Sequence, residues 1–400
     1  MSDLDLELSE RLAALRREEL YRELRPVDSA QGTRVSIRGK RLLNFSSNDY
    51  LGLANHPALK EAAKAAIERY GAGAGASRLI CGSLGVHHKL DEEIAAFKGT
   101  AAALSFSTGY ATALGAICAV MGKDDVVILD KLVHASIVDA ARLCGAKLRV
   151  FHHHDLDDLE HKLKWAAARR RTSAGRTLVV TESVFSMDGD LAPLRELVAL
   201  KEEYGAWLMV DEAHATGLYG ARRRGLGEAC GLSEHIEIQM GTLGKALGSC
   251  GGYICGSQNL IDYLVNRART FIFSTAPAPA AAGAAIEALL LVQAQVGEER
   301  CSRLWQRRTE LGLILNSLPR GAARWAGQGS EPASAIVPIP IGDERQALKA
   351  AQALQERGIL IPAIRYPTVA RGEARLRLTI TAGHTAADLQ ELRAALEGIS

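Results

Sequence analysis

The feature that most constrains the fold is a regular alternation of short β-rich runs with helical patterns, which begins near residue 101. Alternation of this kind predicts βαβ units, and these build a mainly parallel sheet covered by helices on both faces. The sequence therefore predicts an α/β fold around a seven-stranded sheet. The expected strands are residues 102–106, 126–129, 147–151, 177–181, 207–210, 236–240 and 253–255.

The pattern changes at both ends of the chain. Leucines at positions 4, 8, 12, 15 and 20 predict an amphipathic helix in residues 1–25, which we expect to pack on another part of the molecule or on a second subunit. After Pro277 and Pro279, a long helix precedes short strands at 335–339 and 375–380 and a helix at 346–357. We therefore predict an N-terminal helix and arm (1–45), a large domain (46–280) and a smaller α+β domain (281–400).

Composition excludes several classes of partner and site. A net charge of +2 gives no whole-protein argument for nucleic acid or a membrane surface. The most apolar stretch, residues 280–296, is interrupted by Glu287 and Gln293, which favours a buried helix over a membrane span. Seven scattered cysteines without a C-x-x-C pair indicate reduced thiols. With an acidic start unlike a signal peptide, these features predict a cytoplasmic protein.

Polar residues follow four of the predicted strands. Ligands of open α/β sheets bind at the carboxyl ends of the strands, so we expect these side chains to converge. The turn after 102–106 presents backbone N–H groups at Gly109 and Tyr110 that suit a phosphate. The other three strands lead to residues 182–189, to Asp211 and His214, and to Thr242 and Lys245.

Lys245 and Asp211 together indicate a pyridoxal-phosphate site. An aldehyde cofactor needs a lysine amine that holds it as a Schiff base, and a carboxylate that keeps its pyridine nitrogen protonated. Each residue also has a plainer interpretation, because Asp211 could be a helix cap and Lys245 a solvated lysine in a glycine-rich loop. His134 could likewise be a hydrogen-bonded histidine near a helix start. Their joint occurrence at strand ends favours the cofactor site.

Two other motifs give weaker signals. The glycine-rich run 71–76 satisfies a relaxed dinucleotide fingerprint, but residues 58–70 before it have a helical pattern instead of the required strand. The run His152, His153 and His154 suggests a metal. Because neighbouring residues of an extended chain point to opposite faces, one ion could hardly use all three, and we expect no metal site.

Several segments resemble the α-oxoamine synthases. These segments are 44–53, 184–189, 211–217 and 242–245, and the resemblance extends from about residue 20 to the C-terminus. The family consists of fold-type-I pyridoxal-phosphate enzymes that join an amino acid to an acyl-CoA with loss of carbon dioxide. Within it, residues 363–369 and 374–378 are similar to enzymes that use L-alanine and a pimeloyl thioester, although Tyr366 stands where proline is usual.

The resemblance implies roles for individual residues. Lys245 is the catalytic lysine, Asp211 pairs with the ring nitrogen and His134 stacks on the ring and contacts substrate. The other implied cofactor contacts are Gly109, Tyr110, Ser186, His214 and Thr242, with Ser274 and Thr275 reaching in from the second subunit of a homodimer. The implied substrate contacts are Arg22, Asn48, Arg365 and Thr368, of which Asn48 and Arg365 are candidates for the amino-acid carboxylate.

Three alternatives remain at this stage. Another α-oxoamine synthase activity, such as that of glycine C-acetyltransferase, 5-aminolevulinate synthase or serine palmitoyltransferase, would keep the chemistry and change the substrates. An aminotransferase would accumulate the pyridoxamine form of the cofactor and release no CoA. A non-catalytic binding module has no need for a lysine, an acid and histidines at consecutive strand ends.

Overall fold

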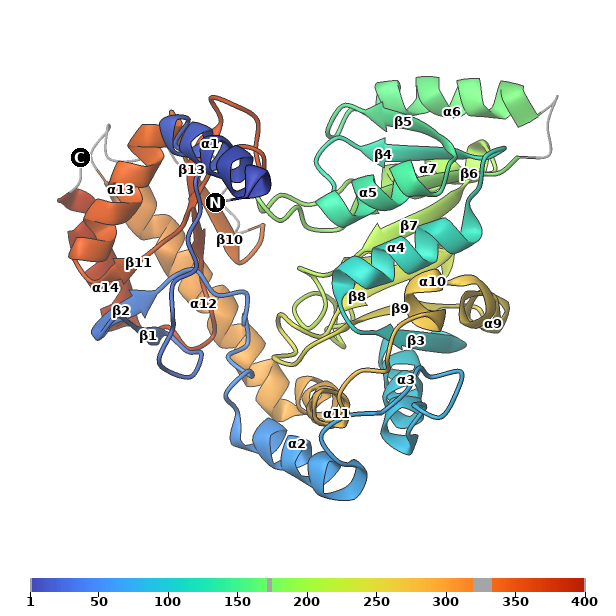
Figure 1. Cartoon of the computed structure of the whole chain (residues 1–400), viewed down its shortest axis with the longest axis horizontal. Helices are drawn as coiled ribbons and strands as arrows, with labels where there is room; N and C mark the ends of the chain where they lie inside the picture. Colours follow the sequence, from blue (N-terminus) through green and yellow to red (C-terminus); the bar gives the residue numbers. More distant parts are fainter. Residues whose placement is uncertain (1, 171–174, 319–332, 399–400) are drawn as a thin grey trace. The chain divides into compact units, whose positions relative to one another are not determined.

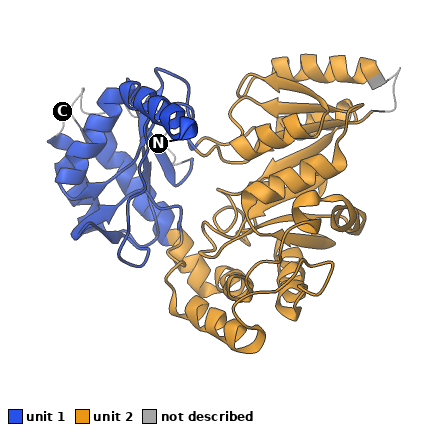
Figure 2. Cartoon of the chain, viewed as in Figure 1, with its two compact units in different colours: residues 1–50, 187–189, 303–400 blue, residues 51–186, 190–302 orange. Residues whose placement is uncertain are grey.

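The computed structural model describes residues 2–170, 175–318 and 333–398, and it divides into two compact units (Figures 1 and 2). Unit 1 comprises residues 1–50, 187–189 and 303–400, and unit 2 comprises residues 51–186 and 190–302. The three-part division predicted from the sequence stays a prediction.

Unit 2 is built on a seven-stranded sheet with the strand order β3-β9-β8-β7-β6-β4-β5. Strands β4 to β8 pair in parallel, whereas β9 runs antiparallel to both of its neighbours, β3 and β8. The predicted α/β architecture is therefore confirmed. The strands are β3 (Ala102–Phe106), β4 (Val126–Asp130), β5 (Lys147–Phe151), β6 (Thr177–Glu182), β7 (Trp207–Asp211), β8 (Ile238–Thr242) and β9 (Gly252–Gly256).

Helices cover the sheet of unit 2, as Figure 1 shows. One face carries a continuous core in which α4, α5 and α9 pack on alternate residues of the strands, such as Val127, Val180 and Ile254. The other strands are buried on both faces, which explains their nearly unbroken apolar runs, whereas β5 at the end of the strand order is mostly exposed. The helices are α2 (Pro57–Tyr70), α3 (Gly85–Lys98), α4 (Gly109–Val120), α5 (Ala135–Leu143), α6 (Leu156–Arg170), α7 (Leu194–Glu203), α8 (Leu226–Ala229), α9 (Gln258–Arg267), α10 (Arg269–Ile272) and α11 (Pro279–Gln293), with a 3-10 turn at Ser233–His235.

Unit 1 contains two three-stranded sheets, ordered β1-β2-β11 and β10-β13-β12. The expected strands near 335 and 375 are β10 and β13, which pair antiparallel, and the helix expected between them is α13. The elements are α1 (Asp3–Arg17), β1 (Arg34–Ile37), β2 (Lys40–Asn44), β10 (Ile336–Gly342), α13 (Glu344–Glu356), β11 (Ile359–Leu360), β12 (Ala363–Ile364), β13 (Ala374–Thr379) and α14 (Ala386–Glu397), together with α12 (Gln295–Ser317), which begins in unit 2.

Two details differ from the sequence prediction. Helix α1 ends at Arg17 instead of reaching residue 25, because the backbone N–H groups of Leu20 and Tyr21 turn back to the carbonyl of Leu15. Strand β8 starts two residues later than expected.

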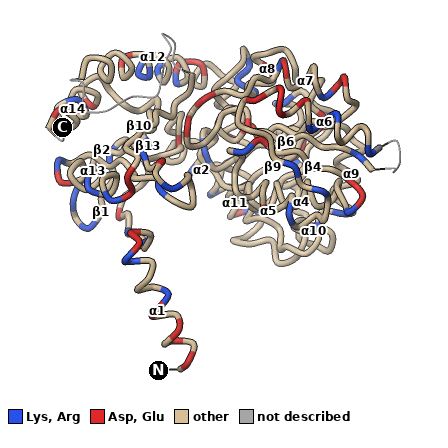
Figure 3. The backbone as a smooth tube through the Cα atoms, turned by 90° about the horizontal axis from the view of Figure 1, so that it is seen from above, with Lys and Arg blue, Asp and Glu red and all other residues tan. Residues whose placement is uncertain are grey.

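Helix α1 buries none of its residues, so its leucines do not pack on the rest of unit 1. Figure 3 shows the helix standing clear of the remainder of that unit. Packing on a second subunit stays a prediction.

No single helix in the described ranges is long and apolar enough to cross a membrane. Helices α11 and α12 reach the length and apolar composition of a membrane span only when they are taken together, and this pair is bent by 74°.

Candidate active site

The predicted catalytic lysine lies in the connection between β8 and β9. Lys245 Nζ is 2.7 Å from Nε2 of His214, which is buried in the segment after β7. The connection is closed by backbone hydrogen bonds, in which Gly248 N–H donates to the carbonyl of Lys245 and Ser249 N–H to that of Leu243. The structure therefore brings together Lys245 and His214, which are 31 residues apart in sequence.

Asp211 ends β7 and is 5 % exposed. Its Oδ1 accepts a hydrogen bond of 2.9 Å from the backbone N–H of Ala213. Burial raises the pKa of Asp211, while the charges of Lys245 and His134 act in the opposite direction. Asp211, Lys245 and His134 therefore share one electrostatic environment, and a cation next to Asp211 would be strongly favoured there.

His134 is the N-cap of α5. Its Nδ1 accepts a hydrogen bond of 3.3 Å from the backbone N–H of Ser136 and lies 2.8 Å from Ser136 Oγ. Desolvation of the ring lowers the pKa of His134, although the residue as a whole remains exposed. A neutral ring fixed from its Nδ1 side suits stacking on a flat ligand.

The start of α4 and the end of β8 form a second part of the site. Thr108 caps α4, and the first N–H groups of a helix lack partners within it, so they suit a phosphate. A Cβ added at Gly109 would lie 3.9 Å from Thr242 Oγ1, which shows how closely the two residues approach. Tyr110 is exposed, and its hydroxyl donates to Asp139 Oδ2 at 2.6 Å.

The chemistry of these groups fits pyridoxal phosphate. They comprise an amine, a buried carboxylate, an imidazole and a helix N-terminus beside Thr242. Ser186 lies after β6 in the same unit and is half-buried. Ser274 and Thr275 follow α10, where Thr275 bridges to Ser77, and their predicted role toward a second subunit stays a prediction.

The four predicted substrate contacts lie in unit 1. Arg365 donates to the carbonyls of Glu19 (2.7 Å) and Tyr21 (2.8 Å). Thr368 N–H donates to the carbonyl of Arg365, and Arg22 reaches the carbonyl of Tyr366 at 3.5 Å. The structure thus brings Arg22, Arg365 and Thr368 into one neighbourhood.

Asn48 has a polar partner different from those of the other three residues. Its Oδ1 accepts a 3.1 Å hydrogen bond from Arg377, a guanidinium for which no role was predicted. Arg377 is 5 % exposed and also donates to Thr379 Oγ1. In the sequence, Arg377 stands where basic and apolar residues alternate along 374–378, a pattern that indicates the strand but not the role of the arginine.

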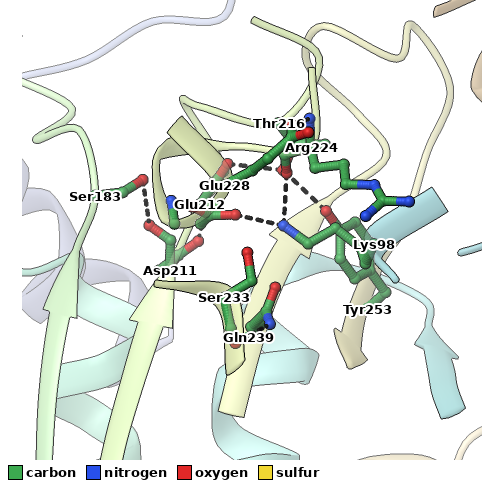
Figure 4. Close-up of polar contacts among 12 residues, drawn as sticks. Lys98, Ser183, Asp211, Glu212, Thr216, Arg224, Glu228, Ser233, Gln239 and Tyr253 are labelled. Atoms are coloured by element: carbon green, nitrogen blue, oxygen red, sulfur yellow. Dashed lines mark hydrogen bonds and ion pairs between the residues drawn. The ribbon is translucent and has the colours of Figure 1, made fainter. Parts of the chain in front are cut away.

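A buried ion pair braces the segment that carries Asp211 and His214. Lys98, the last residue of α3, contacts Glu212 and donates to the carbonyl of Arg224 at 2.6 Å (Figure 4). The other carboxylate oxygen of Glu212 accepts the backbone N–H of Gly227 at 2.8 Å. No local pattern could have revealed this pair, because its members are 114 residues apart.

The histidine run has a different geometry from the one predicted. His152 Nδ1 lies 2.8 Å from Asp158 Oδ2, whereas the rings of His153 and His154 stack with centroids 3.8 Å apart. The argument from an extended chain was wrong for this pair, because His154 has a φ of 60°. Both rings contact Asp190, and His153 also contacts Asp130.

A cavity of about 790 Å³ lies at the ends of the strands β7 and β8 that are opposite to Asp211 and Thr242. The residues that line it include Trp207, Ile238 and Tyr263. Trp207 begins β7, whereas Asp211 ends it. The large cavity is therefore separate from the predicted catalytic residues.

The sequence of the chain matches one family of known proteins. Residues 40–396 match the model of aminotransferase class I and II. The chain is 46 % identical to 8-amino-7-oxononanoate synthase of Geotalea daltonii over 97 % of its length and 96 % of the relative's. It is 47 % identical to the enzyme of the same name from Geobacter sulfurreducens, again over 97 % and 96 %.

Solved structures agree with this comparison. A serine palmitoyltransferase from S. paucimobilis with a bound PLP–myriocin aldimine has a TM-score of 0.91 and 30 % identity, over 100 % of this chain and 98 % of that one. An 8-amino-7-oxononanoate synthase from Francisella tularensis has a TM-score of 0.74 and 27 % identity, over 89 % and 97 %.

Proposed function

Because the chain belongs to the aminotransferase class I and II family, we propose that it is a pyridoxal-phosphate-dependent acyltransferase of the α-oxoamine synthase type. It joins L-alanine to pimeloyl-CoA, or to a pimeloyl carrier protein, and forms 8-amino-7-oxononanoate for biotin biosynthesis. The observation that carries this assignment is 46–47 % identity over nearly the whole chain to synthases of that name.

The reaction forms one carbon–carbon bond and breaks three bonds. The alanine Cα–H bond breaks, and Cα attacks the thioester carbonyl carbon, so that the C–S bond breaks and the thiol leaves. The resulting β-keto acid loses its carboxylate as carbon dioxide, and Cα then takes up a proton. When bound, pyridoxal phosphate supplies an aldehyde that joins the substrate amine and a ring that accepts the electron pair of the broken bond.

The residues of the site suit these steps. The Lys245 amine, 2.7 Å from His214, would hold the cofactor aldehyde between turnovers and would move the proton at Cα. Buried Asp211 would keep a neighbouring nitrogen base protonated. His134 would offer a ring face, Ser186 and His214 would hydrogen-bond to the cofactor, and the start of α4 with Thr242 would bind its phosphate. In this proposal Asn48 and Arg365 bind the substrate carboxylate, and Arg22 and Thr368 contact the acyl substrate.

A homodimer with active sites at the subunit interface is part of the proposal. Large apolar side chains are exposed on unit 2 at Leu79 (49 %), Ile80 (79 %) and Phe273 (70 %), close in sequence to the bridged pair Ser77 and Thr275. An apolar surface of this kind suits a partner subunit, toward which Ser274 and Thr275 then project. No cysteine of the described residues takes part in a disulfide, which favours the cytoplasm.

Thiol release from pimeloyl-CoA, measured separately with alanine, glycine and serine, tests the assignment. We expect release with alanine at least about tenfold faster than with glycine or serine, a difference of about 1.4 kcal/mol in activation free energy. Preference for glycine would favour glycine C-acetyltransferase activity. Accumulation of pyridoxamine phosphate without thiol release would indicate an aminotransferase.

A further inference from the structure

Two histidines and two aspartates form a cluster in unit 2 that the proposed reaction does not use. Asp130 ends β4, His153 and His154 follow β5, and Asp190 lies in the connection after β6. These three strands are neighbours in the order β6-β4-β5. The sheet therefore gathers, at the carboxyl ends of adjacent strands, four side chains of the kinds that bind or support a metal ion.

Three of these side chains direct ligand atoms toward one another. Nε2 of His153 lies 2.7 Å from Oδ2 of Asp190, and Nε2 of His154 lies 3.3 Å from the same oxygen. All three atoms lie within 4.8 Å of one another. The ligand atoms of a tetrahedral Zn²⁺ stand about 3.3 Å apart, since each is roughly 2.0–2.1 Å from the ion, so these spacings suit one ion held by all three.

The second ring nitrogen of His153 contacts a buried carboxylate. Nδ1 lies 3.0 Å and 3.1 Å from the two oxygens of Asp130, which is 2 % exposed and also accepts the backbone N–H of Leu132 at 2.8 Å. A carboxylate that accepts the Nδ1–H of a histidine fixes the orientation of the ring and leaves Nε2 to bind a metal. Asp130 therefore stands where metal-binding histidines commonly have their supporting carboxylate.

An unusual backbone conformation brings the second histidine to the cluster. His154 has a φ of 60°, which lies in the left-handed region that few residues other than glycine adopt. Its ring stacks on that of His153 at 3.8 Å, and the buried ring of Phe185 meets both edge to face. Because of this conformation both imidazoles reach Asp190, whereas an extended chain would turn one of them away.

The charge and the exposure of the cluster also suit a divalent cation. Two aspartates supply two negative charges beside two imidazoles, which are neutral when they bind a metal. Oδ1 of Asp190 is buried and has no hydrogen-bond partner among the described residues, so this carboxylate has capacity left for a cation. The side chains of His153, His154 and Asp190 are 21 %, 34 % and 35 % exposed, which leaves room for an ion and a water molecule to enter.

We propose that His153, His154 and Asp190 form a zinc-binding site, in which water is the fourth ligand and Asp130 supports His153. Two imidazoles and a carboxylate are ligands that Zn²⁺ prefers in proteins. The expectation that the histidine run binds no metal concerned one ion shared by all three histidines. This site needs only two of them, and its third protein ligand comes from a different connection.

Zinc and a proton compete for the same place in this site. Without metal, both ring nitrogens of His153 donate to carboxylates, Nδ1 to Asp130 and Nε2 to Asp190. The proton on Nε2 leaves when zinc binds there. The bound ion joins the connection after β5 to the connection after β6. The inference goes beyond the proposed function and does not depend on the reaction.

Zinc titration of the cofactor-loaded full chain, freed of metals with a chelator, tests the proposal. We expect one zinc ion per chain with a Kd below about 10 μM by calorimetry. His154→Asn removes one ligand, while asparagine tolerates the left-handed backbone, and it should weaken binding by at least about tenfold. His152→Asn is the matched control, because His152 contacts Asp158 instead of the cluster, and it should bind zinc like the wild type.

Two further measurements separate a metal site from a network of hydrogen bonds. Asp130→Asn supplies no ligand to the ion, yet it should weaken zinc binding by about 10- to 100-fold, because it alters the support of His153. Cobalt(II) in place of zinc should give the strong visible absorption of a four-coordinate ion in the wild type and in His152→Asn. This absorption should be lost in His154→Asn.

Three results would overturn the inference. These are a wild-type Kd for zinc above about 10 μM, a His154→Asn variant that binds zinc as tightly as the wild type, and a cobalt spectrum typical of a six-coordinate ion. None of these measurements uses the catalytic reaction. Failure of the proposed function would show separately, as absence of thiol release by the wild type, and would leave the zinc titration interpretable.

Discussion

Lys98 and Glu212 form an ion pair that is nearly inaccessible to water, with side-chain exposures of 2 % and 1 %. Glu212 directly follows Asp211. Its second carboxylate oxygen accepts a hydrogen bond from the backbone N–H of Gly227, and its backbone carbonyl accepts one from the hydroxyl of Thr216. The pair therefore links the end of α3 to the segment that presents Asp211 and His214. It fixes the backbone from which the two site residues project.

Breaking this ion pair from one side should destabilise the protein strongly. Lys98→Met leaves Glu212 charged and buried, and we expect a loss of about 3–5 kcal/mol in the free energy of unfolding, measured with urea. The double variant Lys98→Met, Glu212→Leu should recover a large part of this loss. Lys64→Ala, which removes a pair of exposed residues (68 % and 70 %), is the control and should cost less than about 1 kcal/mol. Additive losses in the double variant would contradict the coupling.

Removal of the proposed catalytic amine should abolish covalent attachment of the cofactor but not folding. Lys245→Ala is expected to unfold at a urea concentration close to that of the wild type. It should yield no cofactor-labelled peptide after borohydride reduction, because it lacks the amine that lies 2.7 Å from His214 and whose charge acts on Asp211. Lys147→Ala, at an exposed position that begins β5, should label like the wild type. A label mapped by mass spectrometry to another lysine would refute the assignment.

Arg365 should affect alanine binding. Loss of a charge-assisted hydrogen bond to a carboxylate costs roughly 1.5–3 kcal/mol, so Arg365→Ala should raise the KM for alanine by about 10- to 150-fold. Because Arg365 also holds the carbonyls of Glu19 and Tyr21, unfolding should be measured in parallel. Arg371→Ala, which removes an exposed pair with Glu18, serves as the control. An unchanged KM would move the carboxylate site elsewhere, with Arg377 as the next candidate.

The stability of the protein should depend on pH through His153. Desolvation disfavours the charged ring, but hydrogen bonds to Asp130 and Asp190 outweigh it and raise the pKa of His153 from 6.5 to about 9. Because the folded-state pKa is the higher one, the stabilisation is complete below about pH 6.5 and is lost as the pH rises through about 9. Thermal unfolding across this range should show the loss in the wild type and in His152→Gln. It should be absent in His153→Gln, and equal slopes in all three would contradict the assignment.

The sequence predicted those features that depend on local pattern. The seven strands of the sheet were predicted from short apolar runs bounded by polar residues, with β8 two residues out of place. Lys245 and Asp211 were predicted as site residues because a charged residue after such a run is unusual, and their roles stay predictions. The parts that depend on distant contacts were not predictable. Lys98 is an ordinary helix-ending lysine in sequence, and only folding places it against Glu212.

The antiparallel strand β9 has a consequence for the proposed catalytic amine. Because β8 and β9 pair directly, the intervening residues 243–251 form a closed hairpin connection, which the strand ladder holds at both ends and which has backbone hydrogen bonds of its own. The Lys245 amine therefore stands at the end of a four-carbon side chain whose backbone is held by hydrogen bonds. Rotation about the side-chain bonds changes the position of its nitrogen without breaking any of these backbone hydrogen bonds.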